Sequence, residues 1–246
     1  LVALIPDVVP YEHAAFTTVG AIALHGVRQA DVQLGDSVVV IGLGLVGLLT
    51  VQLLKASGAR VFGIDVNPAR CELAQQQGAD RVALRADDVV GLVRDFTHGY
   101  GADVVMLTAG GSTNDPIELA GELARDRGKV VVVGLLKMDV PQRLYYEKEL
   151  TVLLSRSYGP GRYDPVYEEM GIDYPIGYVR WTERENMREF LRLLAERKVQ
   201  VEPLITHRYP IERAAEAYNL LASPEGGKVI GALIEYPQTT ETPRRT

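Results

Sequence analysis

A chain of 246 residues, 47% of them hydrophobic and 24% charged, is long enough to bury a core and predicts an ordered globular protein. Its net charge of −6, without any run of Lys or Arg, argues against nucleic acid or an anionic membrane as partner, and no apolar stretch is long enough to span a bilayer. The single cysteine and four scattered histidines indicate neither an intramolecular disulfide nor a metal site. The charge leads us to expect small molecules and protein as partners, and the absence of a spanning or signal-peptide pattern leads us to expect a cytoplasmic location.

An N-terminal segment with Ala14, Thr18 and Ala21 at helical spacing precedes a regular alternation of short β-branched runs with helical patterns. These runs are apolar throughout, which is typical of strands in a parallel sheet that is covered by helices on both faces. The six predicted strands are Ser37–Ile41, Arg60–Ile64, Arg81–Leu84, Asp103–Leu107, Lys129–Val133 and Leu150–Leu154.

Helix start and stop signals lie between these runs. Asn67 before Pro68 is typical of an N-cap followed by the first helical residue, and Asn114 or Asp115 before Pro116 repeats the signal. Right-handed crossovers would then wind the strands in the order 3-2-1-4-5-6, a doubly wound α/β Rossmann fold. A ligand is expected where the two halves meet, between the first and fourth strands.

After the sixth strand the pattern changes. The stretch Tyr158–Tyr178 is rich in Gly, Pro and Tyr without periodicity and predicts a long ordered loop. A capping box of Thr182 and Glu185 then predicts a helix start. A second helix is expected at Ile211–Leu221 and a last strand at Lys228–Ile234.

A glycine-rich turn follows the first predicted strand directly and leads into a helical run. Gly42 permits a tight turn, Gly44 lets the backbone approach a diphosphate, and Gly47 lets the helix pack closely on the strand. The N–H groups at the start of the helix would face the phosphates, and a plain strand-to-helix turn is the alternative. The expected cofactor contacts are Gly42, Leu43, Gly44, Leu45, Val46 and Gly47.

An acidic residue, Asp65, ends the second predicted strand 18 positions after Gly47, where it would accept hydrogen bonds from the adenosine ribose. A 2′-phosphate at that place would meet a carboxylate, so NAD is favoured over NADP. Val66 is expected beside the same ribose. Arg70 either softens this repulsion or is a solvated helix residue.

Small residues end two further strands. Thr108-Ala109-Gly110 ends the fourth strand and Gly134-Leu135 ends the fifth. Each of these glycines could belong to an ordinary turn, but their common position at strand carboxyl ends indicates room for the nicotinamide half of the cofactor.

With these motifs the chain resembles the cofactor domain of the medium-chain dehydrogenase/reductase family, the zinc-type alcohol dehydrogenase relatives. The resemblance is carried by Leu34-Gly35-Asp36 before the glycine turn, Gly101-Ala102-Asp103 before the fourth strand and the closing Gly227-Lys228-Val229. It implies an NAD-dependent oxidoreductase that transfers hydride to or from a carbinol or carbonyl, and a homodimer. A narrower resemblance, carried by Ala15–Ala23 and Arg156–Tyr163, is to two-part bacterial oxidoreductases with a glucose–fructose oxidoreductase-like module, and it implies a sugar-like substrate.

The chain departs from the zinc members of this family. The segment Phe16-Thr17-Thr18 stands near the position of a metal ligand and offers no thiolate, so we expect no catalytic zinc. The family's substrate-binding fold would precede Leu1, so we expect an inactive piece of a longer polypeptide. The expected parts are a catalytic-domain remnant (1–30), the NAD-binding domain (31–155), a C-terminal segment of the truncated catalytic domain (156–236) and a disordered tail (237–246).

No catalytic residue is assigned, because every candidate has a packing alternative. The candidates are His25, His207, Tyr158, Arg162 and Tyr163.

Two other functions stay open. An S-adenosylmethionine methyltransferase also pairs a glycine turn with an acidic second-strand end, although Val40-Ile41 lacks the acidic residue usual before such a turn. A non-catalytic nucleotide-binding module is the third possibility.

Overall fold

The computed structural model describes residues 2–237 and divides the chain into two compact units, Leu1–Gln200 and Val201–Thr246. The tail that the sequence predicts to be disordered lies outside the described residues from 238 onward. Among the helices within 2–237, none has both the length and the apolar character needed to cross a bilayer.

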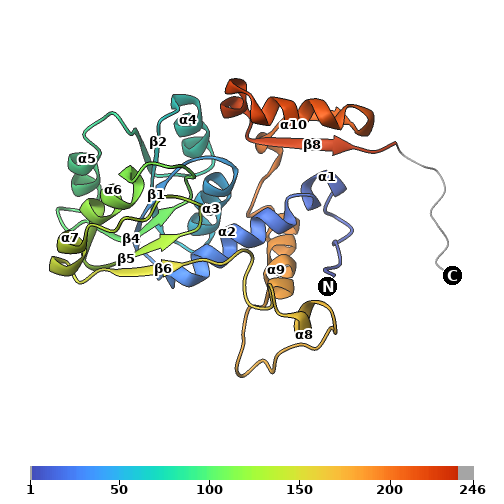
Figure 1. The fold of residues 1–246 in the computed structure, drawn as a ribbon, viewed down its shortest axis with the longest axis horizontal. Helices are drawn as coiled ribbons and strands as arrows, with labels where there is room; N and C mark the ends of the chain where they lie inside the picture. Colours follow the sequence, from blue (N-terminus) through green and yellow to red (C-terminus); the bar gives the residue numbers. More distant parts are fainter. Residues whose placement is uncertain (1, 238–246) are drawn as a thin grey trace. The chain divides into compact units, whose positions relative to one another are not determined.

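Six parallel strands form the centre of the first unit, in the order β3-β2-β1-β4-β5-β6 (Figure 1). This order confirms the predicted doubly wound Rossmann fold. All five residues of β1 are buried, as a strand with neighbours on both sides and helices on both faces requires. The strands are β1 Ser37–Ile41, β2 Arg60–Asp65, β3 Arg81–Leu84, β4 Ala102–Leu107, β5 Ala124–Val132 and β6 Thr151–Leu154.

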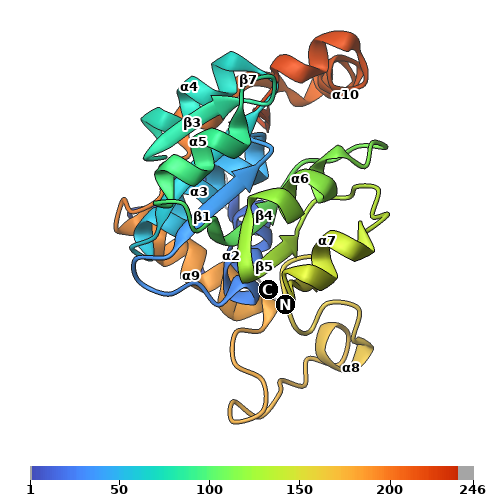
Figure 2. The same cartoon turned by 90° about the vertical axis from the view of Figure 1, so that its left-hand side faces the viewer.

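Helices cover both faces of this sheet (Figure 2). Helices α2, α3 and α4 contact one another in series along one face, and α5, α6 and α7 do so along the other. Helix α9 packs on α2. The helices of this unit are α1 Tyr11–Ala14, α2 Thr17–Ala30, α3 Leu45–Ala56, α4 Pro68–Gln76, α5 Val89–Phe96, α6 Asp115–Leu123, α7 Gln142–Glu147, α8 Pro165–Glu168 and α9 Glu183–Ala195.

The core follows from the alternation of side chains along each strand. In β1, Val39 and Ile41 join the apolar cluster that includes Phe96 of α5 and Ile117 of α6. Met106 of β4 faces the opposite side, since a side chain added at Gly26 of α2 would meet its methyl carbon at 3.2 Å. Strands that bury both faces explain why their sequences are apolar without alternation.

The predicted fifth strand is too short. Strand β5 begins at Ala124, directly after α6, because Ala124 pairs with Ala102 before a register shift brings Lys129 opposite Val104. The predicted N-cap at Asn114 is only half right. The helix starts there, but the Asn114 side chain makes no capping bond and its amide donates to Glu118 and to the Asp139 carbonyl.

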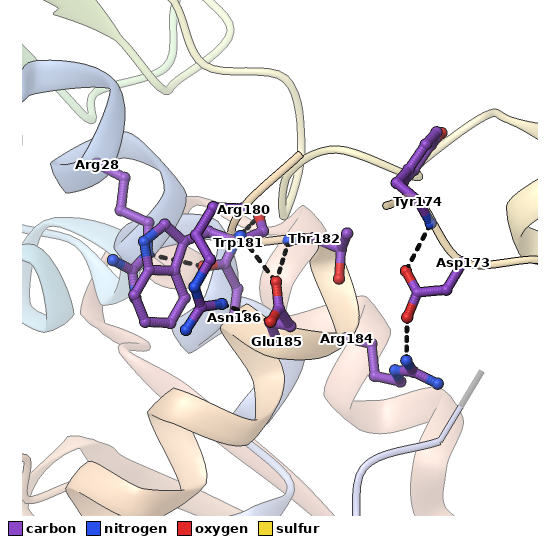
Figure 3. Close-up of polar contacts among 9 residues, drawn as sticks. All are labelled: Arg28, Asp173, Tyr174, Arg180, Trp181, Thr182, Arg184, Glu185 and Asn186. Atoms are coloured by element: carbon purple, nitrogen blue, oxygen red, sulfur yellow. Dashed lines mark hydrogen bonds and ion pairs between the residues drawn. The ribbon is translucent and has the colours of Figure 1, made fainter. Parts of the chain in front are cut away.

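The stretch 155–182 is an ordered excursion with a single short helix, α8. At its end the Glu185 carboxylate accepts backbone hydrogen bonds from Trp181 (2.7 Å) and Thr182 (3.0 Å), which is the glutamate half of the predicted capping box (Figure 3). The Trp181 ring lies between two guanidinium groups, with the carbon of Arg28 at 3.4 Å and that of Arg180 at 3.6 Å from its centre. These contacts anchor the excursion to α2 and α9.

The second unit is a small parallel pair of strands joined by a helix. Strand β7 (Ile205–Pro210) pairs with β8 (Gly231–Glu235), and α10 (Ala214–Ala222) connects them. Short 3₁₀ turns flank these elements at Glu202–Leu204, Ile211–Arg213 and Pro224–Lys228. The helix predicted from residue 211 therefore becomes α-helical only at residue 214, and the last strand begins at residue 231 instead of 228.

Candidate dinucleotide-binding site

The glycine turn between β1 and α3 is packed so closely that two of its glycines have no room for a side chain. Gly42 has a φ of +97°, and a Cβ there would lie 2.5 Å from the backbone nitrogen of Ala109. A Cβ on Gly47 would lie 1.9 Å from the carbonyl oxygen of Gly42. Thr108 donates its hydroxyl to that same oxygen at 2.6 Å, which ties the end of β4 to the turn.

Gly44 is different, because a Cβ built on it would meet no atom within 4 Å. It is the N-cap of α3, and no side chain caps the first turn of that helix. Backbone N–H groups at a helix start carry partial positive charge and need acceptors. The open space at Gly44 therefore lies where a helix can bind an anion.

Asp65, at the carboxyl end of β2, is a buried carboxylate with two fixed hydrogen bonds. Its Oδ2 accepts from the backbone nitrogen of Leu43 at 2.6 Å, and its Oδ1 accepts from that of Asn67 at 2.9 Å. Arg70 lies on α4 with Nη1 3.8 Å from Asp65 Oδ2. The carboxylate is thus locked beside the glycine turn.

A pocket of 340 Å³ opens at the carboxyl ends of β1, β2 and β4. It brings together eight of the expected contacts: Gly42, Gly44, Asp65, Val66, Arg70, Thr108, Ala109 and Gly110. Six further residues that the sequence analysis did not single out as contacts complete it: Ile41, Ile64, Arg85, Thr113, Asp115 and Pro116.

Six expected contacts do not line this pocket: Leu43, Leu45, Val46, Gly47, Gly134 and Leu135. Leu43 is fully buried, and its side chain lies against Gly63 of β2. A Cβ on Gly134 would lie 2.0 Å from the carbonyl oxygen of Ala109, so a glycine there lets β5 approach the loop after β4. Leu135 is 92% exposed.

Arg85 and Asp115 are site residues that sequence reasoning missed. Arg85 follows β3, and its Nε and Nη2 donate to the two oxygens of Asp115, the first residue of α6, at 2.9 and 2.5 Å. The only available signal was that both follow predicted strands at the same sheet edge. No local pattern indicates that two residues 30 positions apart form a pair.

The acid–base candidates do not meet in the pocket. His25 is buried in α2, and burial, reinforced by the nearby charges of Arg28 and Arg156, lowers its pKa to about 4. It therefore fits the packing alternative. His207 lies on β7 in the second unit, where its Nδ1 is 2.9 Å from the Thr206 hydroxyl.

The three candidates on the excursion contact one another. The Arg162 guanidinium carbon lies 4.3 Å from the ring centre of Tyr163 and 5.6 Å from that of Tyr158. Its Nη1 pairs with Glu168 at 2.5 Å. These contacts favour a role in holding the excursion together.

Glu183, the first residue of α9, is a buried carboxyl that the sequence analysis did not single out. It is fully buried, and neither oxygen has a hydrogen-bond partner among the described residues. Burial, and then the nearby negative charge of Glu168, raises its pKa to about 7 although Arg162 opposes the shift.

A zinc ion needs several His, Cys, Asp or Glu side chains whose ligand atoms converge on one point. Among residues 2–200, no three His, Cys, Asp or Glu side chains bring their ligand atoms together. Cys71 is buried on α4, with its sulfur 3.4 Å from the Ala83 carbonyl oxygen.

The chain is similar to several known dehydrogenases. It is 31% identical to the sorbitol dehydrogenase of Halalkalibacterium halodurans over 233 residues, which cover 92% of this chain and 60% of that enzyme. Among solved structures, an alcohol dehydrogenase from Thermus sp. ATN1 matches 95% of the chain and 62% of its own length, with a TM-score of 0.75 and 25% identity. A protein of Sinorhizobium meliloti 1021 solved with NADP bound matches 94% of this chain and 61% of its own, with a TM-score of 0.74 and 25% identity.

The chain thus spans about 60% of the length of the sorbitol dehydrogenase it matches. A family model described as zinc-binding dehydrogenase matches residues 46–171, which include all but the first residue of α3, strand β2 with Asp65, and the pocket residues from Ile64 to Pro116. Because this match covers more than half of the chain and agrees with its six-stranded fold and glycine turn, the chain belongs to the zinc-binding dehydrogenase family of medium-chain oxidoreductases, as a cofactor-binding domain.

Proposed function

We propose that this chain binds NAD(H) in the pocket at the carboxyl ends of β1, β2 and β4. The oxidoreductase to which it belongs would transfer hydride between the nicotinamide and a carbinol or carbonyl group. The single observation that carries the proposal is the open space at Gly44, at the uncapped start of α3.

The diphosphate would lie at this open space. It would accept hydrogen bonds from the N–H groups in the first turn of α3, which no side chain caps. The absence of a Cβ at Gly44 keeps the space clear for phosphate oxygens. A bound dinucleotide would supply the hydride chemistry, while these residues bind and orient it.

The preference for NAD over NADP rests on Asp65. Its buried carboxylate lines the pocket and is fixed by two backbone N–H groups, so it cannot easily turn away from a ligand. Ribose hydroxyls can donate to the remaining lone pairs, whereas a 2′-phosphate would be repelled. Arg70, whose Nη1 lies 3.8 Å from Asp65 Oδ2, offsets only part of that repulsion, because the carboxylate itself would contact the ribose.

The substrate part of the proposal rests on similarity. The sorbitol dehydrogenase relative acts, by its name, on a polyol, so we propose a sugar-like carbinol or carbonyl for the complete enzyme. The substrate-binding part would come from the catalytic domain of the same polypeptide, in a homodimer. The loops Thr108–Gly110 and Gly134–Leu135 are proposed to flank the nicotinamide.

The sorbitol dehydrogenase and alcohol dehydrogenase relatives give no support to the methyltransferase alternative. Fluorescence titration of the chain with NADH, NADPH and S-adenosylmethionine tests the proposal. We expect NADH to bind at least about ten-fold more tightly than NADPH, and S-adenosylmethionine not to compete. Tighter binding of NADPH would contradict the NAD preference, and failure of both dinucleotides to bind would contradict the function itself.

A further inference from the structure

The ion pair between Arg85 and Asp115 joins the segment after β3 to the start of α6, and both residues line the pocket. Arg85 follows β3, and its backbone nitrogen donates to the carbonyl of Asp65 at 2.9 Å. Asp115 opens α6, which follows β4.

The pair therefore lines the same pocket as the glycine turn and Asp65. The pocket is lined by two guanidinium groups, Arg70 and Arg85, and two carboxylates, Asp65 and Asp115. In the proposed function, the start of α3 takes the diphosphate and Asp65 takes the ribose. With the diphosphate and the ribose assigned, the adenine base is the next part of the dinucleotide that could contact Arg85.

A guanidinium is planar and stacks on aromatic faces, and adenine is an aromatic base. The two hydrogen bonds to Asp115 lie in the plane of the Arg85 guanidinium, so they fix its orientation and leave its faces free to stack. We propose that Arg85 is the adenine-stacking residue of this site and that Asp115 is the positioning residue that holds its plane. This inference rests on the proposed function, because it assigns a residue to one end of the same ligand.

The ion pair between Arg81 and Asp95, at the other end of β3, is an exposed surface pair outside the pocket. Arg81, at the start of the strand, pairs with Asp95 at 2.5 Å, with half of the arginine side chain and 69% of the aspartate side chain exposed. Neither residue lines the pocket. The Arg81→Ala variant is therefore a matched control, since it removes an Arg–Asp ion pair at the other end of β3.

The test compares three ligands on the 246-residue chain: NADH, 5′-AMP and reduced nicotinamide mononucleotide, which lacks the adenosine half. We expect Arg85→Ala to weaken NADH and 5′-AMP binding about ten-fold, the scale of a cation–π contact, and to leave the mononucleotide unchanged. Arg85→Lys keeps the charge but lacks the planar group, so it should lose nearly as much. Asp115→Asn should lose less, and Arg81→Ala should bind all three ligands like wild type.

The results distinguish a failure of the Arg85 assignment from a failure of the proposed dinucleotide binding. If wild type binds NADH but Arg85→Lys binds 5′-AMP as tightly as wild type, stacking by Arg85 is refuted. Equal weakening of the mononucleotide would refute it too, because the loss would then not be confined to the adenine end. If wild type itself binds no NADH, the proposed function fails.

Discussion

The Oδ2 atom of Asp65 accepts a 2.6 Å hydrogen bond from the backbone nitrogen of Leu43, which joins the end of β2 to the glycine turn. The same carboxylate lines the pocket. Asp65 therefore has two roles that a substitution would affect together: it shapes the turn, and in our proposal it binds the adenosine ribose.

Replacing Asp65 with Ala should lower both stability and affinity. The N–H groups of Leu43 and Asn67 would lose their acceptor, so we expect the free energy of unfolding to fall by about 1–3 kcal/mol in denaturant titrations. NADH binding should weaken by a similar free energy, and the penalty against NADPH should shrink. An unchanged ratio of NADH to NADPH affinity in a folded variant would refute the role of Asp65 in selecting NAD.

Alanine substitutions at two glycines of the same turn should have different effects, one on NADH affinity and the other on stability. Gly44→Ala adds a methyl group in open space at a φ of −73°, so we expect the melting temperature to stay within a few degrees of wild type. NADH binding should nevertheless weaken about ten-fold or more, because the methyl group occupies the space proposed for the diphosphate.

Gly47→Ala is the matched comparison. Its new Cβ would lie 1.9 Å from a backbone oxygen that cannot move without distorting the turn, so we expect a loss of about 3 kcal/mol or more in unfolding free energy. Normal NADH affinity in Gly44→Ala would show that the open space does not hold the diphosphate.

Glu183 should make stability depend on pH. Burial raises the pKa of its carboxyl from 4.5 to about 7 in the folded chain. The unfolded chain releases this proton at the lower pH, so raising the pH from about 4.5 to 7 lowers the free energy of unfolding. Above about pH 7 this loss of stability stays constant. Glu183→Gln removes the titration, so the variant should be more stable than wild type at about pH 8, by about 1–2 kcal/mol.

Denaturant unfolding at several pH values checks this expectation, with Glu196→Gln as the control. Glu196 is exposed and pairs with Arg192 and Lys198, so its loss should not stabilise the chain at high pH. A Glu183→Gln variant with the same pH dependence as wild type would show that the Glu183 carboxyl ionises normally in the folded chain.

The packing of α2 on α9 depends on Gly20. A Cβ there would lie 2.2 Å from Cζ of Phe190, a fully buried ring on α9. Although alanine favours the helical backbone by about 1 kcal/mol, the overlap should dominate, so we expect Gly20→Ala to lower the unfolding free energy by about 1–3 kcal/mol. In a double-mutant cycle, Phe190→Leu should recover part of that loss, whereas strictly additive effects would argue against this contact.

Much of the fold could be predicted from the sequence because its signals are local. A strand buried on both faces must be apolar throughout, so runs such as Ser37–Ile41 indicate a parallel sheet, and right-handed crossovers then restrict the strand order. The glycine turn was predictable for the same reason, since its glycines stand at a fixed spacing between a predicted strand and a predicted helix, and a Cβ on Gly47 would overlap the carbonyl oxygen of Gly42 within the same turn. Strand and helix ends were less accurate, because the pairing partner sets them, as Ala102 does for the start of β5.

The candidate site, too, has some residues that the sequence predicts and others that only the structure shows. The sequence by itself determined that Gly42, Gly44 and Asp65 come together at one edge of the sheet, because the spacing along one strand–helix–strand unit specifies their positions. Only the tertiary structure decided that Arg85 meets Asp115, that Gly134 lies against Ala109, and that the Glu183 carboxyl is buried with no hydrogen-bond partner among the described residues. These relationships join segments far apart in the chain, and they depend on how the strands and helices pack, which no local pattern of residues encodes.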